Sequence, residues 1–267
     1  MITSLSNPRV KQVVLWQTKA RERKKDQIFL AEGLKMYEEA PESWIKEVFI
    51  IEETLQKIQK EEKDLLKKLE KTGYETVSPE VFQKMSDTQS PQGILIVLKR
   101  PKYDLEALLQ VKNPLFVLLE DLQDPGNLGT IVRTGEGAGV TAVIMTENTV
   151  DIYNPKTIRA TMGSIYRVPI LYVESLEKVI ESLHNIGVKV YAAHLDGKDY
   201  YDSFSFCEGT AFLIGNEGNG LKKATADLAS SYLKIPMEGQ VESLNAAIAT
   251  SLLMYEAHRQ RVSQTHR

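Results

Sequence analysis

The polar residues best placed for chemistry fall in three glycine-containing segments, of which the first is DPGNLGTIVRTGEGAGV, residues 124–140. A proline–glycine pair favours a turn there, and Asn127 can cap the helix that follows. Gly129 would let the backbone approach a ligand or another chain closely. Arg133 lies six residues beyond Asn127, one to two turns into that helix. Taken alone, this pattern is equally typical of a capped helix with a surface arginine.

The second segment, LIGNEGNGL at residues 213–221, bends the chain around an acidic side chain. Gly215 and Gly220 have the separation of the two glycines in a phosphate-binding P-loop, but that motif requires Lys and then Ser or Thr directly afterwards. Leu221 stands there instead, which excludes a P-loop. Glu217 lies in the middle of the bend, where the plain structural interpretation is a glycine turn with an exposed acid.

The third segment, IPMEGQVESLNAAIATSL at residues 235–252, connects a strand to the last helix. Pro236 ends the strand, Gly239 breaks the loop, and Ser243 or Asn245 begins the helix. By itself this segment predicts only a well-capped helix. In an open α/β sheet, however, ligands bind at the carboxyl ends of the strands, and these segments occupy that edge.

Other kinds of active site find little support in the sequence. The four histidines are scattered, and no Cys/His spacing suggests a metal site, so we expect no metal. No G-x-S-x-G motif marks a serine hydrolase. The stretch TGEGAGV has G-x-G-x-G late in its helix instead of the dinucleotide fingerprint at the start, which disfavours a nicotinamide-dependent oxidoreductase.

Composition predicts a soluble, cytoplasmic protein that does not enter a membrane. The chain of 267 residues is 42% apolar, but runs such as LFVLL are too short to span a bilayer. Its single cysteine fits a reducing compartment, and no signal peptide is expected at the N-terminus. The net charge is −3, yet residues 1–30 hold seven Lys or Arg against two acids. Such a basic arm can bind phosphates, although a solvated helix face explains it equally well.

The N-terminal hundred residues predict a small α/β domain. A helix begins with Asn7 as its cap and Pro8 at the first helical position, and continues to Lys25. Strand-like runs follow, and a Lys/Glu-rich helix is expected to end at Gly73. Composition breaks at residues 99–104 and 111–114 predict a domain at 1–100, a linker at 101–113 and a domain at 114–267.

The C-terminal part predicts a parallel sheet. Its apolar runs LFVLLE, TAVIM, YRVPIL, VKVYAAHL, TAFLIG and YLKIP lack the alternation of a one-sided sheet. Such runs are typical of buried parallel strands that helices cover on both faces. The chain ends in SLNAAIATSLLMYEAHRQR, a long apolar helix with charge only in its last turns. The predicted fold class is therefore α/β.

The order of the three segments adds a family resemblance. NLGTIVRTGEGAGV, LIGNEGNGL and IPMEGQVESLNAAIATSLLMYEA resemble motifs one, two and three of the SpoU/TrmH family of RNA ribose 2′-O-methyltransferases, over about residues 115–260. Upstream, FLAEGLKMYEEA resembles the opening of that family's N-terminal substrate-binding domain. The resemblance implies a smaller N-terminal α/β RNA-binding domain and a C-terminal parallel-sheet domain with a deep trefoil knot, a SPOUT-like fold. It also implies a homodimer and S-adenosylmethionine as cofactor.

Carried onto this chain, the resemblance implies a cofactor site and an active site. The cofactor contacts would be Gly215, Ile235, Leu244 and Ala193, and the polar active-site set would be Asn127, Arg133, Glu217, Ser243 and Asn245. Some members have a second serine where this chain has Ala247, to which we assign no hydroxyl role. A guanidinium rarely gives up its proton, so we expect Arg133 to bind a substrate phosphate and to stabilise a developing oxyanion.

The resemblance favours methyl transfer from S-adenosylmethionine to a ribose 2′-hydroxyl of structured RNA. A separate N-terminal RNA-binding domain favours ribosomal RNA over transfer RNA. Two alternatives stay open: a knotted methyltransferase that acts on a base nitrogen or on tRNA, and a non-catalytic RNA-binding protein of the same fold. The arginine of the first segment argues for ribose. The joint presence of Arg133, Glu217, Ser243 and Asn245 argues for catalysis, because a mere binder would not require them.

Overall fold

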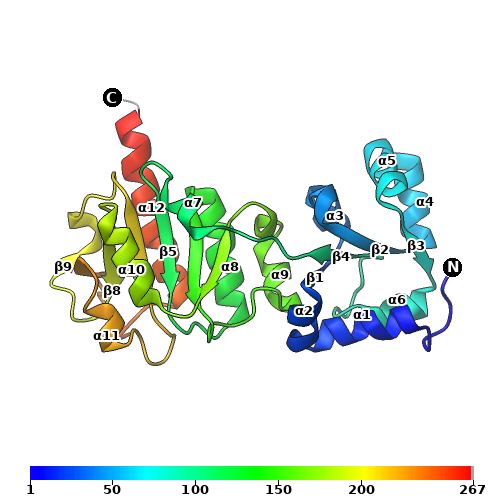
Figure 1. The fold of residues 1–267 in the computed structure, drawn as a ribbon, viewed down its shortest axis with the longest axis horizontal. Helices are drawn as coiled ribbons and strands as arrows, with labels where there is room; N and C mark the ends of the chain where they lie inside the picture. The colour runs from blue at the N-terminus through cyan, green and yellow to red at the C-terminus, as the bar shows by residue number, and fades with distance from the viewer. Residues whose placement is uncertain (266–267) are drawn as a thin grey trace. The chain divides into compact units, whose positions relative to one another are not determined.

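The computed structural model describes residues 1–265 and divides into two compact units. The N-terminal unit comprises residues 1–102 together with 151–166, and the C-terminal unit comprises 103–150 and the chain from residue 167 onwards. Each unit has its own sheet, and Figure 1 labels several elements of each. Among the described residues, no helix is both long and apolar enough to cross a membrane.

The N-terminal unit is built on a four-stranded sheet in the order β1-β4-β2-β3. Its strands are β1 (Ile28–Glu32), β2 (Ile45–Ile51), β3 (Glu75–Val77) and β4 (Ile94–Lys99). Its helices are α1 (Pro8–Thr18), α2 (Ala20–Asp26), α3 (Leu34–Glu39), α4 (Glu52–Glu61), α5 (Lys63–Thr72), α6 (Pro79–Met85) and α9 (Pro155–Thr161). Strand β4 is antiparallel to both neighbours. A core that includes Trp16, Phe49 and Phe82 joins α1 and α6 to the sheet.

The helix predicted from Asn7 to Lys25 is two helices in the structure. Its predicted start is confirmed, because the Asn7 side chain accepts the N–H of Arg9 and Pro8 lies in the first turn. The predicted continuity is wrong, because Lys19 is extended, with φ −121° and ψ 103°, and separates α1 from α2. The break lets α2 turn a buried arginine into the unit, a long-range contact that helix periodicity cannot indicate.

The Lys/Glu-rich helix predicted to end at Gly73 is also divided. Helices α4 and α5 meet at Glu62, whose φ of −129° is not helical. Both helices contact β2, so the break allows two short helices to cover one strand. The predicted end is confirmed, since Gly73 terminates α5 with a positive φ of 73° that favours glycine.

Residues 151–166 complete the core of the N-terminal unit, although they follow a strand of the C-terminal sheet. The ring of Tyr153 lies 5.1 Å from that of Phe29, measured between centroids. The hydroxyl of Tyr166 donates to the main-chain carbonyl of Met36 at 3.0 Å. The sequence analysis assigned this segment to the C-terminal domain, because composition carries no signal that the chain returns to the first unit.

The C-terminal unit contains a seven-stranded sheet in the order β7-β6-β5-β10-β8-β11-β9. Its strands are β5 (Leu115–Leu119), β6 (Ala142–Thr146), β7 (Ile170–Val173), β8 (Lys189–Ala193), β9 (Asp199–Tyr200), β10 (Thr210–Ile214) and β11 (Ser231–Lys234). Every pairing between neighbours is parallel, which confirms the predicted parallel sheet. Each of the six predicted apolar runs contributes to a strand, whereas the short edge strand β9 was not predicted. The trefoil knot stays a prediction.

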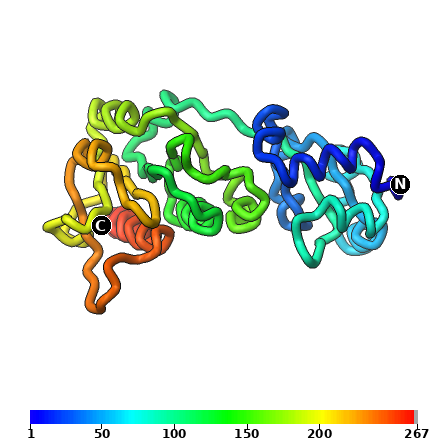
Figure 2. The backbone as a smooth tube through the Cα atoms, turned by 90° about the horizontal axis from the view of Figure 1, so that it is seen from below, coloured from blue at the N-terminus to red at the C-terminus, as the bar shows by residue number. Residues whose placement is uncertain are grey.

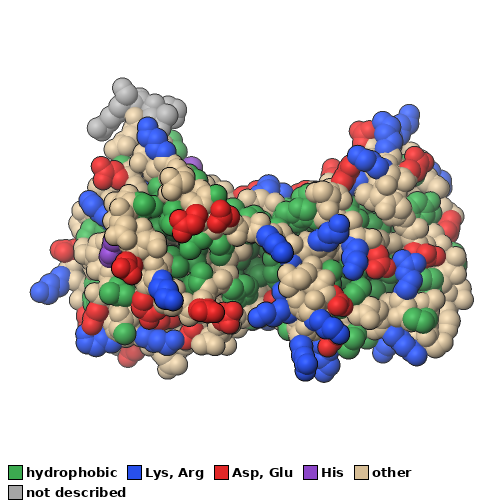
Figure 3. Space-filling model, viewed as in Figure 1, with side chains coloured by type: hydrophobic (Ala, Val, Ile, Leu, Met, Phe, Trp, Pro, Cys, Tyr) green, Lys and Arg blue, Asp and Glu red, His purple; other side chains and the backbone are tan. Residues whose placement is uncertain are grey.

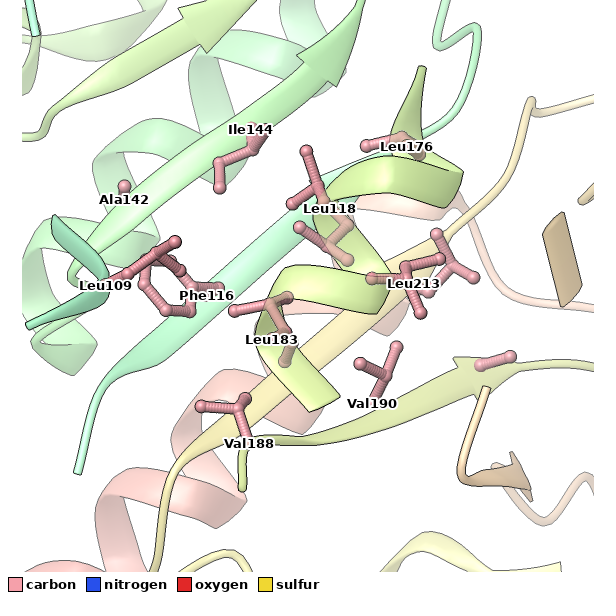
Figure 4. Close-up of a cluster of buried hydrophobic side chains, with 14 residues drawn as sticks. Leu109, Phe116, Leu118, Ala142, Ile144, Leu176, Leu183, Val188, Val190 and Leu213 are labelled. Carbon is pink, nitrogen blue, oxygen red and sulfur yellow. The ribbon is translucent and has the colours of Figure 1, made fainter. Parts of the chain in front are cut away.

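Helices lie on both faces of the C-terminal sheet. On one face, α7 (Leu105–Leu109) and α10 (Leu176–Asn185) close a core around Phe116, Leu118 and Leu213 (Figure 4). The long helices α8 (Pro125–Ala138) and α12 (Ala246–Thr265) pack against each other, and α12 also contacts β10. Burial on both faces explains why the strand sequences lack polar alternation.

Helix α12 is held to the rest of the C-terminal unit by Arg261. Its guanidinium donates hydrogen bonds of 2.7 to 3.1 Å to four main-chain carbonyls, those of Asn113, Pro114, Phe206 and Glu208. Two of these carbonyls precede β5 and two precede β10. Burial lowers the pKa of Arg261, but a guanidinium remains protonated in proteins. One side chain therefore fixes the helix against two adjacent strands.

We expect Arg261→Met to destabilise the protein by about 2 kcal/mol or more, because the methionine leaves partly buried carbonyls without a donor. Chemical denaturation of the full chain measures the effect. Arg259→Met is the matched control, since Arg259 is two residues away, is exposed and, within residues 1–265, forms its ion pair with Glu256 on the same helix. Equal stability of the two variants would show that the four carbonyl contacts contribute little.

Candidate active site

Three loops meet at the carboxyl edge of the C-terminal sheet. They follow β5, β10 and β11, at residues 120–124, 215–222 and 235–245. Strands β5 and β10 end level, because Ile214 pairs with Leu119 in their parallel register. The third loop projects from the unit before α12 begins (Figure 2). The second and third loops lie in the second and third segments that the sequence singles out, and the first loop leads into the helix of the first segment.

The carboxylate of Glu217 ties the second loop to the first. It accepts the main-chain N–H groups of Gln123 and Asp124 at 3.0 and 2.9 Å, and the side-chain amide of Asn127 at 3.0 Å. These donors lie at the N-terminus of α8, where the helix dipole also favours a negative charge. Burial alone would raise the pKa of Glu217, but the hydrogen bonds outweigh it and hold the pKa below its ordinary value of 4.5.

Asp124, and not Asn127, caps α8. The Asp124 side chain accepts the N–H of Asn127 at 2.7 Å, and Pro125 takes the first helical position. The prediction that Asn127 caps the helix is therefore wrong, because the helix starts before that residue. Since the cap is supplied by another side chain, the Asn127 amide can join separate loops.

Asn127 and Asn245 connect the first loop to the third. The Asn245 amide donates to the Asn127 side-chain oxygen at 2.9 Å. The Asn245 oxygen in turn accepts the N–H groups of Ala247 and Ile248, so this residue caps α12 as the sequence analysis allowed. Glu217, Asn127 and Asn245 form a continuous hydrogen-bonded chain, which we call the three-loop network. The network links the N-termini of both long helices to the glycine-rich loop.

The glycine-rich loop is closed by two main-chain hydrogen bonds between Asn216 and Gly220, of 3.0 and 2.9 Å. This closure packs Gly215 so tightly that an added Cβ would lie 2.2 Å from the carbonyl carbon of Gly220. The Asn216 side chain also accepts the N–H groups of Gly218 and Asn219. The wall of the site at this point is therefore main chain, and no larger residue than glycine fits at position 215.

Sequence reasoning missed two residues that hold this loop. The Asn216 amide donates to the main-chain carbonyl of Asp121 at 2.9 Å. Glu120, only 3% exposed, accepts the N–H of Lys222 and the hydroxyl of Thr225. The sequence did contain signals for both residues. Asparagine is common in turns, and a carboxylate that directly follows an apolar strand is rarely buried without a partner. Their partners lie about a hundred residues away along the chain, beyond the reach of local patterns.

A cavity of about 520 Å³ opens beside the three loops. Its walls include the four predicted cofactor residues, Gly215, Ile235, Leu244 and Ala193, and three of the predicted active-site set, Glu217, Ser243 and Asn245. His194, which the sequence analysis did not single out, also lines it, and its ring lies 4.7 Å from that of Tyr232. Within residues 1–265 no cluster of His, Cys, Asp or Glu is arranged to hold a metal ion.

Arg133 stands apart from this arrangement. It lies on the exposed side of α8 with Thr130 and Gly137, and it is not among the residues that line the cavity of its own protomer. Its side chain makes no hydrogen bond or ion pair with any residue in the described range 1–265. Ser243 is likewise exposed and makes no side-chain hydrogen bond within that range. The structure thus brings Glu217, Ser243 and Asn245 to the cavity wall, joins Asn127 to them through hydrogen bonds, and leaves Arg133 apart.

An apolar stripe follows the exposed side of α12. Ile248, Leu252, Tyr255 and Val262 are spaced at three to seven residues, which places them on one helix face, and each is about 40 to 50% exposed. Helix α8 approaches this stripe closely, since a Cβ added to Gly137 would lie 2.9 Å from the Tyr255 hydroxyl. Exposed apolar residues in a continuous line are typical of a surface that another chain covers.

Models of two protein families match the chain. The SpoU rRNA Methylase family matches residues 114–255, and the MRM3-like substrate binding domain matches residues 7–96. Among characterised proteins, the chain is similar to the 23S rRNA (guanosine(2553)-2′-O)-methyltransferase RlmP of Bacillus subtilis. The two are 35% identical over 95% of this chain and 97% of that protein.

Solved structures are also similar to this chain, one over nearly its whole length and one over part of it. An AdoMet-bound rRNA methyltransferase from Sinorhizobium meliloti is 30% identical, with a TM-score of 0.85 over 97% of both chains. A structure described as giving insights into 2-OH methylation of C/U34 on tRNA is also 30% identical, with a TM-score of 0.52. The match covers 99% of that chain but only 58% of this one.

We expect Glu217→Gln to lower thermal stability at neutral pH, because a neutral amide cannot accept three hydrogen bonds as the carboxylate does. A carboxyl group whose pKa is depressed by folding stabilises the protein above its unfolded pKa, and this contribution is lost as the pH falls through the folded value. The difference between wild type and variant should therefore narrow below about pH 4. Thermal melts from pH 3 to pH 8 measure it.

Glu238→Gln serves as the control for this prediction, because Glu238 lies exposed in the third loop and makes no ion pair within the described chain. A wild-type advantage that stays constant across the whole pH range would contradict the assigned charge-dependent contacts.

Proposed function

The chain belongs to the SpoU rRNA methylase family, and from this premise we propose that it methylates a ribose 2′-hydroxyl of ribosomal RNA with S-adenosylmethionine. The observation that carries the proposal is the cavity at the carboxyl edge of the sheet, bounded by Gly215, Ile235 and Leu244 and joined to α8 by the three-loop network. The AdoMet-bound S. meliloti structure, similar over nearly the whole chain, supports the cofactor.

The residues around the cavity suit this cofactor. The volume of about 520 Å³ lies in the range of about 300 to 1,000 Å³ that small-ligand sites occupy. Leu221, Ile235 and Leu244 offer an apolar slot for an adenine ring, and the tightly packed loop at Gly215 presents main-chain groups to it. When bound, S-adenosylmethionine supplies a methyl group activated by a sulfonium, so that a C–O bond forms as the C–S bond breaks. No metal is required for that displacement.

The chain's own residues then have to place the 2′-hydroxyl and manage its proton. Asn127, Glu217 and Asn245 already satisfy one another, so we assign them the task of positioning the loops. Ser243, exposed at the cavity, is available to hydrogen-bond the RNA backbone or a water molecule. Arg133 stays protonated, binds the adjacent phosphate and stabilises negative charge on the 2′-oxygen. The proton of the 2′-hydroxyl passes to that phosphate or to the water molecule that Ser243 binds.

Arg133 requires a second protomer to perform this role. It does not line the cavity of its own chain, yet it lies exposed on α8, which packs against the helix that carries the apolar stripe. A homodimer that covers Ile248, Leu252 and Tyr255 would bury this stripe and bring Arg133 towards the partner's cavity. An isologous dimer would then contain two composite active sites.

Ribosomal RNA is favoured over transfer RNA as the substrate. The rRNA methyltransferases from B. subtilis and S. meliloti match at least 95% of the chain, including the N-terminal unit. The structure associated with tRNA methylation leaves about two fifths of this chain unmatched. Because the N-terminal unit matches a substrate-binding domain, we attribute recognition of rRNA to it.

The function is tested by mapping 2′-O-methylated positions in total RNA from cells with and without the gene. We expect one rRNA position to lose its methyl group in the deletion strain and to regain it with the wild-type gene. Arg133→Lys should restore less than about a tenth of the methylation, because an ammonium cannot bind phosphate and ribose oxygens in a bidentate manner. Complementation by Arg133→Lys at the wild-type level would show that Arg133 does not act through bidentate contacts. Loss of a tRNA or base methyl group in the deletion strain would overturn the assignment of the substrate.

The composite site is tested by mixing two inactive variants. Arg133→Ala removes the guanidinium, and Gly215→Ala should block the cofactor site, because its Cβ has no room against Gly220. Co-expressed, they should recover about a quarter of wild-type activity, since half of the dimers are mixed and each mixed dimer has one intact site. Melting temperatures of the separate variants verify that both are folded. Absence of any recovery, with mixed dimers present by affinity tagging, would place Arg133 in the site of its own chain.

A further inference from the structure

The seven Lys and Arg side chains of residues 1–30 form two groups in the structure, those held by internal contacts and those exposed on the surface. Arg9 is bound between Glu47 and Glu75, at 2.9 and 2.8 Å, and its guanidinium lies over the ring of Phe49. Arg23 is 2% exposed and therefore cannot reach a ligand. Lys11, Lys19, Arg21, Lys24 and Lys25 are exposed, and none makes a side-chain ion pair or hydrogen bond within residues 1–265. Arg9 and Arg23 therefore help to hold the fold together, and the other five cations lie on the surface.

One side of helix α2 carries the buried arginine, and the other side carries exposed cations. Arg23 points inward, donates to the Trp16 carbonyl at 2.7 Å and pairs with Asp151 at 2.7 Å. At 100° per residue, the side chains of Arg21, Lys24 and Lys25 gather on the opposite side of the helix. The buried ion pair therefore holds α2 in a fixed orientation with three cations facing outward.

Within residues 1–265 neither acid of α2 forms an ion pair with these three cations. Asp26 already accepts the indole N–H of Trp16 at 2.7 Å, which leaves Glu22 as the other acid on α2. Lys99, exposed at the end of β4, is the strand partner of Ile28, two residues after α2 ends, and extends the positive surface. In the space-filling view, Lys and Arg side chains are prominent over α2 (Figure 3).

Helix stability does not account for this arrangement. Cations in the last turn interact favourably with the helix dipole, which suffices for Lys24 and Lys25. Arg21 lies in the first turn, where the dipole disfavours a positive charge. Interaction with the helix dipole therefore does not explain a positive charge at this position.

We propose that Arg21, Lys24, Lys25 and Lys99, which we call the α2 basic patch, bind the phosphate backbone of the rRNA substrate. The proposal rests on the function proposed above and assigns a specific surface of the substrate-binding domain to the RNA. Side chains three and four residues apart on a helix are neighbours, so they present a compact row of positive charge. Contacts of this kind read the shape and charge of an RNA helix and not its base sequence.

The test compares two triple variants of the full-length protein with equal changes of charge. Arg21→Gln/Lys24→Gln/Lys25→Gln removes the outward face of α2. Lys57→Gln/Lys60→Gln/Lys63→Gln removes three exposed lysines of α4 and α5 from the same unit. The probe is protein-free large-subunit rRNA, and binding is measured by filter retention at salt concentrations from about 50 to 200 mM.

We expect the α2 variant to bind rRNA on the order of tenfold more weakly and to reduce the slope of log affinity against log salt by about 2 to 3. The α4/α5 variant should stay within about twofold of wild type, and both should keep the wild-type melting temperature and S-adenosylmethionine affinity. Wild-type affinity and slope in the α2 variant would overturn the proposal, as would equal losses in both variants. If the wild type methylates rRNA in either case, the proposed function survives the failure of the patch.

Discussion

The geometry of the site depends on one carboxylate held at the start of a helix. Glu217 accepts the two main-chain N–H groups that directly precede α8, together with the amide of Asn127. Through Asn245 the same set of contacts fixes the beginning of α12. The first loop, which lies about ninety residues before the other two along the chain, therefore shares one rigid frame with them. A cavity wall made of irregular main chain needs such a frame, because loops have little packing of their own.

The glycines of this region have separate structural tasks. Gly215 allows the main chain of the second loop to fold back on itself, where any Cβ would meet Gly220. Gly137, at the other end of α8, admits the hydroxyl of Tyr255 and lets two long helices approach closely. The first contact shapes the cavity, and the second sets the surface on which Ile248 and Leu252 are exposed. Helix α8 therefore connects cofactor geometry with the proposed subunit contact.

Features that depend on local sequence could be predicted, and those that depend on distant partners could not. Apolar runs without alternation indicated the parallel sheet, and the caps at Asn7 and Gly73 were readable because they follow from local backbone chemistry. The breaks at Lys19 and Glu62 were missed, since each is settled by packing on distant residues. Contacts between distant residues also explain what could not be predicted about the site. The bend at Glu217 was evident, but its hydrogen-bond partners lie ninety residues or more earlier.

The distribution of charge separates residues that build the protein from residues that are available to RNA. Arg23 and Arg261 are committed to buried ion-pair or carbonyl contacts, and losing them would leave polar groups unsatisfied. Arg133 and the outward cations of α2 are exposed and make no such contacts within residues 1–265. An exposed cation keeps its hydration and counterions until a phosphate displaces them, so it contributes more to RNA binding than one that must first leave an internal partner. A chain with a net charge of −3 can therefore bind a polyanion, because its free positive charge is concentrated on few surfaces.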